Sequence, residues 1–545
     1  MKKILLSLLT GLTLLVSCQS YTQNIEADIQ YPVLPVLTQK AVNPVIRVDL
    51  INQGSEGYEL QQIDLILEGN DVDSISIYGA KKNGMIAPDK LLCKPVAASN
   101  KISFKDALTI DTDTFSLWVS VKLKEQGSLQ NRLQLKLTGI NTSQGRIRLA
   151  KKTSEEKLRL GVAVRQQGQD GVHTSRIPGI ATSKEGTLLA IYDARRERSK
   201  DLQGDIDIAL NRSFDGGHTW EPLQVILDMG EWGGLPQRYN GVSDAGILVD
   251  DHTGDIYVGG LWMYGILDKE TGKWVEGLTA DSTRSQHQWQ AKGSQQGFGV
   301  KETSQFLITK STDDGETWSE PINITPLKKK EWWLFAPAPG HGITLKDGTL
   351  VFPTQGRDET GKPFSNITYS KDGGKSWTVS QPAASGTTEC MAVELSDGSV
   401  MLNMRDNRNR GNDQINGRTI AVTTDLGETW AEHPTSRKAL IEPTCMASIH
   451  KHIYQENGTE KSVLLFVNPS STSKRDHITL KASFDDGQTW PEKYWILLDE
   501  YSGKGYSCIT SVDEQTIGIF YESSQADMVF QQIPLSDILE KDKIE

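Results

Sequence analysis

The sequence Ser213-Phe-Asp-Gly-Gly-His-Thr-Trp220 decides the fold, because the same pattern returns four more times along the chain. Every copy fits S/T-x-D-x-G-x-T/S-W. The Asp and Gly residues favour a tight turn between two strands, and the Trp side chain anchors that turn against the sheet. We interpret each copy as a folding element and expect no chemistry from it. The further copies are Ser311–Trp318, Ser370–Trp377, Thr423–Trp430 and Ser483–Trp490.

The spacing of the copies predicts a propeller. Their Asp residues are separated by 98, 59, 53 and 60 residues. Three of these gaps match a propeller blade of about 40–50 residues plus a connecting loop. The long first gap has room for one blade without the motif, with strand-like segments at Gly246–Val249 and Ile256–Trp262. The pattern therefore predicts a six-bladed β-propeller over residues 161–545.

A separate all-β domain is expected before the propeller, over residues 24–150. Short alternating segments such as Val45–Leu50 and Arg132–Leu137 are separated by stretches rich in Gly, Asn, Asp and Ser. Regular short strands with such turns are typical of a β-sandwich. The polar, charged stretch that follows predicts a linker over residues 151–160. Whether the sandwich binds carbohydrate or serves as a spacer is left open.

The N-terminus predicts export. Two lysines precede the apolar run Ile4–Val16, which is too short to cross a membrane and fits a signal peptide. The run ends in Leu15-Val16-Ser17-Cys18, which resembles the lipobox of bacterial lipoproteins. We therefore expect a lipoprotein signal peptide over residues 1–18 and a lipid anchor at Cys18 as the only membrane attachment. The periplasm and the outer membrane or cell surface both remain open as locations.

Composition excludes several classes of protein. The 545 residues include 58 basic and 70 acidic side chains, a net charge of −12, which argues against nucleic acid as a partner. The remaining cysteines show no CxxC spacing and the histidines form no metal-binding pattern, so we expect no metal and no cofactor. We expect a monomer. These cysteines are Cys93, Cys390, Cys445 and Cys508.

The region from Val162 to the C-terminus, about two thirds of the chain, resembles the bacterial sialidases, whose Asp box is the repeat described above. Ser175-Arg-Ile-Pro-Gly179 is similar to the Phe-Arg-Ile-Pro motif of that family, with Ser175 in place of Phe. Gly505-Tyr-Ser-Cys-Ile509 is similar to the family's segment around its catalytic Tyr. The resemblance implies an exo-α-sialidase that removes terminal sialic acid from glycoproteins, glycolipids and oligosaccharides.

The resemblance also implies a triad of arginines that binds the carboxylate of sialic acid. Arg176 belongs to the Arg-Ile-Pro motif, Arg405 to Asn403-Met-Arg-Asp406, and Arg475 follows an Asn-Pro stretch. Three guanidinium groups around one anion form charge-assisted hydrogen bonds that fix the sugar ring.

The catalytic residues implied by the resemblance are Tyr506 as nucleophile, Glu389 as its base and Asp201 as acid/base, with Asp205 as the alternative to Asp201. Asp244 matches a family residue that contacts the N-acyl or hydroxyl side of the sugar. The anomeric carbon of sialic acid bears a carboxylate, so a neutral Tyr avoids the repulsion that an Asp or Glu nucleophile would meet. The implied reaction is retaining and passes through a covalent sialyl-tyrosine.

Two other functions stay open. An intramolecular trans-sialidase would use the same residues and release an anhydro sugar. A non-catalytic sialic-acid-binding lectin would require the loss of Tyr506, Glu389 or the acid/base Asp, and all three have candidates in this chain. A glycosidase that acts on neutral polysaccharides would not need an arginine triad.

Overall fold

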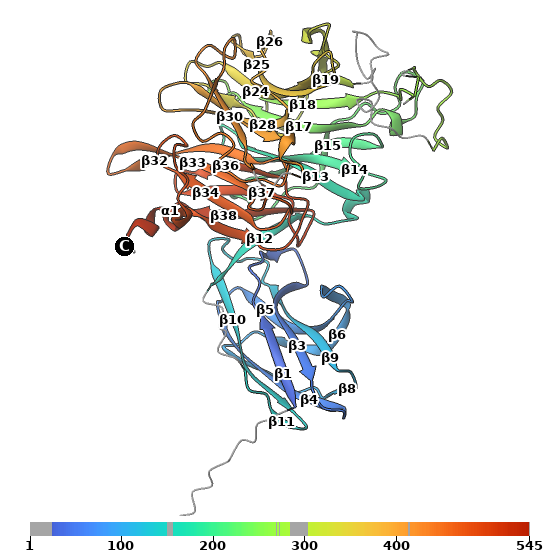
Figure 1. Ribbon diagram of the computed structural model, residues 1–545, viewed down its shortest axis with the longest axis vertical. Helices are drawn as coiled ribbons and strands as arrows, with labels where there is room; N and C mark the ends of the chain where they lie inside the picture. The colour runs from blue at the N-terminus through green and yellow to red at the C-terminus, as the bar shows by residue number, and fades with distance from the viewer. Residues whose placement is uncertain are drawn as a thin grey trace, which may run out of the picture.

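The computed structural model describes residues 24–149, 156–268, 270–271, 273–283, 304–411 and 415–543. The expected signal peptide, the lipidation site Cys18 and residues 151–155 of the expected linker lie outside these ranges. Within the part of the chain that the structure describes, no helix combines the length and apolar character needed to cross a membrane. Figure 1 shows two bodies, a smaller one in blue at the bottom and a larger one above it.

The smaller body is a β-sandwich. One sheet has the order β1-β3-β9-β5-β6, and the second is built on β10, β4 and β7, with β8 and β11 at its ends. Alternate residues of these strands, such as Leu65 and Val119, point inward and form one hydrophobic core. Trp118, between the core residues Leu117 and Val119, points to the opposite face of β9; it is 1% exposed, and its indole N–H donates to Gly84 O at 2.9 Å.

The strands of the sandwich, with the short β2 that leads out of it, are β1 (Ile25–Gln30), β2 (Val36–Thr38), β3 (Asn43–Asn52), β4 (Tyr58–Glu68), β5 (Val72–Ala80), β6 (Ile86–Ala97), β7 (Lys101–Phe104), β8 (Leu108–Ile110), β9 (Thr114–Leu123), β10 (Arg132–Thr142) and β11 (Gly145–Arg146).

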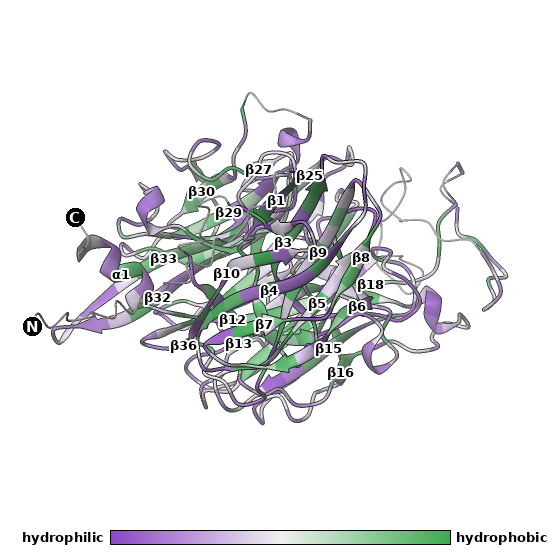
Figure 2. Ribbon diagram, turned by 90° about the horizontal axis from the view of Figure 1, so that it is seen from below, coloured by the Kyte–Doolittle hydropathy of each residue, from purple (hydrophilic) through white to green (hydrophobic). Residues whose placement is uncertain are grey.

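The larger body is a β-propeller, built from antiparallel sheets that follow one another along the chain. Figure 2 shows hydrophobic residues concentrated along the strands and hydrophilic residues in many of the loops. The all-β prediction of a propeller preceded by a sandwich is confirmed.

The sheets, each from its inner to its outer strand, are β13 (Thr174–Thr182), β14 (Leu188–Arg195), β15 (Ile206–Ser213), β16 (Gln224–Leu227); β17 (Val242–Val249), β18 (Ile256–Met263), β19 (Ser304–Ser311), β20 (Ile322–Asn323); β21 (Leu334–Pro337), β24 (Leu350–Arg357), β25 (Pro363–Ser370), β26 (Thr378–Val379); β28 (Thr387–Glu394), β29 (Val400–Asp406), β30 (Thr419–Thr423), β31 (Ala431–Glu432); β32 (Ser448–Glu456), β33 (Thr459–Pro469), β34 (Ile478–Ser483), β35 (Ile496–Asp499); and β36 (Ser507–Asp513), β37 (Thr516–Tyr521), β38 (Met528–Pro534), β12 (Leu158–Arg165). The short strands β22 (Gly340–His341), β23 (Ile343–Thr344) and β27 (Ala384–Ser385) join these sheets, and α1 (Ser536–Leu539) follows the last one.

The propeller is closed by strands from the two ends of the domain. Strand β12 pairs antiparallel with β38, with Val162 opposite Phe530. Strand β12 begins at Leu158, inside the range expected to be linker. The same strand pairs with β10 of the sandwich, and Asp537 accepts hydrogen bonds from Arg132 and Arg159 on these two strands. The two bodies are therefore joined by a continuous sheet and a shared ion pair.

Each Asp box forms the same hydrogen-bonded turn. In the third copy, Asp372 Oδ1 accepts from the Ser370 hydroxyl at 2.8 Å and from the backbone N–H of Ser376 at 2.8 Å, while Oδ2 accepts from the Ser376 hydroxyl at 2.6 Å. These hydrogen bonds, of which the one from the Ser376 side chain contributes most, lower the pKa of Asp372 to about 2. The carboxylate is thus a structural acceptor, as the sequence predicts.

Replacement of Asp372 by Ala should lower the melting temperature, because the turn loses its acceptor, and should leave kcat/KM unchanged, because the turn carries no predicted site residue. Thermal unfolding and an assay of the activity that the sequence predicts, on the same preparation, measure both quantities. Lys375→Ala, an exposed change in the same turn, is the matched control. A loss of activity in Asp372→Ala without a loss of stability would contradict the structural role.

Candidate active site

The inner strands of the propeller bring the predicted site residues to one end of the ring. Arg176 lies near the start of β13, Asp244 near the start of β17 and Glu389 near the start of β28. Tyr506 directly precedes β36. Because successive blades repeat the same strand order around the axis, the first residues of their inner strands converge.

Tyr506, Glu389 and Arg405 form a hydrogen-bonded trio. The Tyr506 hydroxyl donates to Glu389 Oε1 at 2.5 Å, and Arg405 Nη1 donates to Glu389 Oε2 at 2.6 Å and to Tyr506 Oη at 2.9 Å. Tyr506 is 5% exposed. Burial and then the charge of Glu389 raise the pKa of Tyr506 well above its usual value, against the opposite effect of Arg405. The phenol is therefore protonated and donates a hydrogen bond to a carboxylate.

The guanidinium groups of the other two predicted arginines, Arg176 and Arg475, lie over the aromatic ring of Tyr506. The guanidinium Cζ of Arg176 is 5.5 Å from the ring centroid, and that of Arg475 is 5.4 Å from it. Arg475 is held by hydrogen bonds to backbone carbonyls, one of them to Lys504 O at 2.9 Å. Together with Arg405, these side chains place three positive charges around one aromatic ring. Such an arrangement suits an anion that binds above the ring.

Glu522 was missed by the sequence analysis. Its buried carboxylate accepts from Arg176 Nε at 2.5 Å, from the backbone N–H of Ile177 at 2.9 Å and from that of Tyr506 at 3.0 Å. Burial acts to raise the pKa of Glu522, but the charge of Arg176 and these hydrogen bonds leave the pKa below its usual value. Glu522 thus ties the first arginine to the tyrosine. An acidic residue directly after the apolar strand β37 was the available signal.

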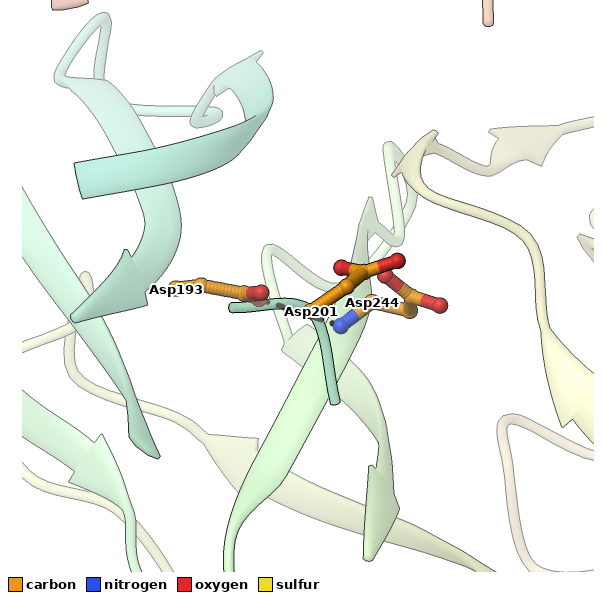
Figure 3. A group of neighbouring side chains, drawn as sticks. All are labelled: Asp193, Asp201 and Asp244. Carbon is orange, nitrogen blue, oxygen red and sulfur yellow. Dashed lines mark hydrogen bonds between the residues drawn. The ribbon is translucent and has the colours of Figure 1, made fainter. Parts of the chain in front are cut away.

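Three aspartates gather on another side of the site. Each of Asp193, Asp201 and Asp244 places a carboxylate oxygen within 4.8 Å of the others (Figure 3). Asp193 and Asp244 are buried, whereas the side chain of Asp201 is 55% exposed. Asp193 Oδ1 accepts from the backbone N–H of Asp244 at 3.0 Å. Burial, followed by the charge of Asp201, raises the pKa of Asp244 well above its usual value.

Arg195 pairs with two of these aspartates. Its Nη2 lies 2.9 Å from Asp193 Oδ2 and 2.5 Å from Asp201 Oδ1. Burial raises the pKa of Asp193 to about 6 in spite of this pair. The three carboxylates are close enough to share a cation, and the guanidinium already supplies positive charge between two of them. Asp193 and Arg195 were not predicted, because a buried ion pair leaves no motif in the sequence.

A cavity of about 270 Å³ joins two of the aspartates to two members of the trio. Asp201 and Asp244 line one part of it, and Glu389 and Arg405 line another. Gln355 also lines it. Asp205, the alternative acid/base residue, is not among the residues that line this cavity.

Comparisons with known proteins show the family to which the chain is similar. The BNR repeat-like domain family matches residues 186–519. A sialidase from Bacteroides fragilis is 43% identical over 425 residues, which cover 77% of this chain and 73% of the relative. A sialidase from Micromonospora viridifaciens is 32% identical over 370 residues, which cover 65% of this chain and 50% of the relative.

Among solved structures, the Hadza microbial sialidase Hz136 superposes with a TM-score of 0.83 at 33% sequence identity. The match covers 94% of this chain and 99% of that one. The similarity therefore includes the sandwich as well as the propeller.

Glu522→Gln should raise KM for a sialoside several-fold and lower the free energy of unfolding by about 3 kcal/mol. Among the described residues, Glu522 is the only buried acid that forms an ion pair with Arg176, and the substitution removes its charge. Steady-state kinetics and denaturant unfolding measure the two effects. Glu221→Gln, which removes the partner of Arg212 in a more exposed ion pair, is the matched control and should change neither. An unchanged KM in Glu522→Gln would argue against the positioning of Arg176 by Glu522.

Proposed function

The chain belongs to the sialidase family and is a glycoside hydrolase, and from this premise we propose a retaining exo-α-sialidase with a covalent sialyl-tyrosine intermediate. The observation that carries the proposal is the trio of Tyr506, Glu389 and Arg405. A protonated phenol donates at 2.5 Å to a carboxylate, and a guanidinium contacts both groups. A nucleophile bonded to its base, with the base oriented by a third group, is the arrangement that nucleophilic catalysis requires.

The first step begins with the carboxylate of sialic acid bound by Arg176, Arg405 and Arg475. Glu389 takes the phenolic proton while Tyr506 Oη attacks the anomeric carbon. The bond to the leaving oxygen breaks, and that oxygen receives a proton from Asp201. The three arginines lie close enough to the tyrosine ring to fix the sugar over it. A neutral nucleophile avoids repulsion with the bound carboxylate.

The second step returns the enzyme to its starting state. Asp201, now ionised, accepts a proton from a water molecule, and that water attacks the anomeric carbon. The bond to Tyr506 breaks and Glu389 returns the proton to the phenolate oxygen. The exposure of Asp201 at the cavity supports this role, because it must meet both the leaving group and water. Asp244 is proposed to contact the N-acyl or hydroxyl side of the sugar.

We also propose the setting in which the enzyme works. The substrates would be sialylated glycoproteins, glycolipids and oligosaccharides, and the enzyme would act as a monomer without a cofactor. The lipobox-like segment that ends at Cys18 supports an exported, lipid-anchored protein.

Incubation of the wild type and Tyr506→Phe with sialyllactose tests the proposal. The wild type should release free sialic acid, and the variant should lose about 1,000-fold or more in kcat, as when a nucleophile is removed. Tyr454→Phe, a buried tyrosine outside the site, should keep full activity.

The products separate the alternatives. An anhydro sugar from the wild type would assign an intramolecular trans-sialidase that uses the same residues. Binding of sialyllactose without any release would assign a lectin. Undiminished turnover by Tyr506→Phe would show that Tyr506 is not the nucleophile.

A further inference from the structure

In the loop that carries Asp201, neighbouring side chains face solvent and the interior in turn. It runs from β14 to β15 and is closed by a backbone hydrogen bond from Arg196 N to Asp205 O at 2.9 Å. The Asp201 side chain is 55% exposed, but Leu202, the next residue, is 2% exposed. Leu202 also has a φ of 55°, in the left-handed region that few non-glycine residues adopt. The surrounding structure must therefore hold it in place.

Leu202 is held by two neighbouring blades. It forms a small hydrophobic cluster with Leu261 and Met263 of β18 and with Leu334 and Ala336 of β21. These strands belong to the next two sheets of the propeller and not to the sheet from which the loop emerges. The leucine side chain therefore attaches the loop to strands of the next two blades. Leu202, Leu261, Leu334 and Ala336 also line the cavity that Asp201 lines, so this cluster forms part of the cavity wall.

Gln203 adds a polar contact next to this apolar one. It is buried, and its Nε2 donates to the backbone carbonyl of Gly265 at 3.0 Å. The following Gly204 packs so closely on Gly241 that a Cβ added at Gly241 would lie 2.4 Å from Gly204 O. Three successive residues after Asp201 thus contact the next blade.

We propose that Leu202 is a positioning residue that fixes the acid/base Asp201 at the cavity, and this inference rests on the proposed acid/base role of Asp201. The ion pair with Arg195 acts only while Asp201 is ionised, and Asp201 must gain and lose a proton in each turnover. The apolar contact of Leu202 does not depend on that charge. It keeps the carboxyl group in the same place in both protonation states.

The leaving group distinguishes positioning of an acid from a general structural role. The leaving group of sialyllactose is lactose, a poorly acidic sugar alcohol that needs a proton from Asp201, whereas an aryl sialoside releases a phenol that needs little help. Leu202→Ala should lower kcat/KM on sialyllactose by about tenfold or more, as expected for a misplaced catalytic group, and by less than about threefold on the aryl sialoside. Asp201→Asn should show the same pattern with a larger loss on sialyllactose.

Three further variants serve as controls. Leu202→Met keeps an apolar side chain of similar volume and should recover most of the activity on sialyllactose. Leu202→Cys, a smaller truncation without a branched β-carbon, provides the same comparison if Leu202→Ala does not fold. Leu345→Ala removes a buried leucine from a separate cluster and should affect both substrates equally.

The results separate failure of this inference from failure of the proposed function. Equal losses on both substrates in Leu202→Ala, or no loss on either, would overturn the positioning role while the pattern of Asp201→Asn stands. If Asp201→Asn itself shows no dependence on the leaving group, the acid role fails and the inference fails with it.

Discussion

The pairing of β12 with β38 is the constraint on which the rest of the structure depends. These strands are separated by almost the whole propeller in sequence, and their hydrogen bonds close the ring, with Val162 opposite Phe530. Closure removes the free sheet edges that an open array would expose. It also holds the first residues of the inner strands around one axis, so that Arg176 meets Tyr506 across 330 positions of sequence. The site exists only in the closed ring.

At the end of the ring that carries the site, arginines and carboxylates form ion pairs. Glu522 holds Arg176, and Glu389 holds Arg405, so each arginine is oriented before an anion binds. On the opposite side of the site, burial and then the charge of the nearby Asp201 raise the pKa of Asp244. Charged groups oriented in a largely buried site need little reorganisation during the reaction, and this is a major source of catalytic power.

The sequence predicted the propeller well because the Asp box is a local structure: its hydrogen bonds join residues within one turn. The structure brings together Arg176, Glu389, Arg405 and Tyr506. They could be predicted because a family resemblance named them. Glu522, Asp193, Arg195 and Leu202 were not predicted, since their importance lies in contacts between segments far apart in the chain. Nothing in the sequence distinguishes Leu202 from other loop leucines. Its role follows from its contacts with residues of the neighbouring blades, which only the structure shows.

The stereochemistry of the first product tests the central claim most directly. Proton NMR during the first minutes of hydrolysis of an α-sialoside distinguishes the anomer that the enzyme releases from the one formed later by mutarotation. Two successive displacements at the anomeric carbon, through a bond to Tyr506, predict that α-sialic acid appears first. Initial release of β-sialic acid would show a single displacement by water and would contradict the covalent tyrosine intermediate.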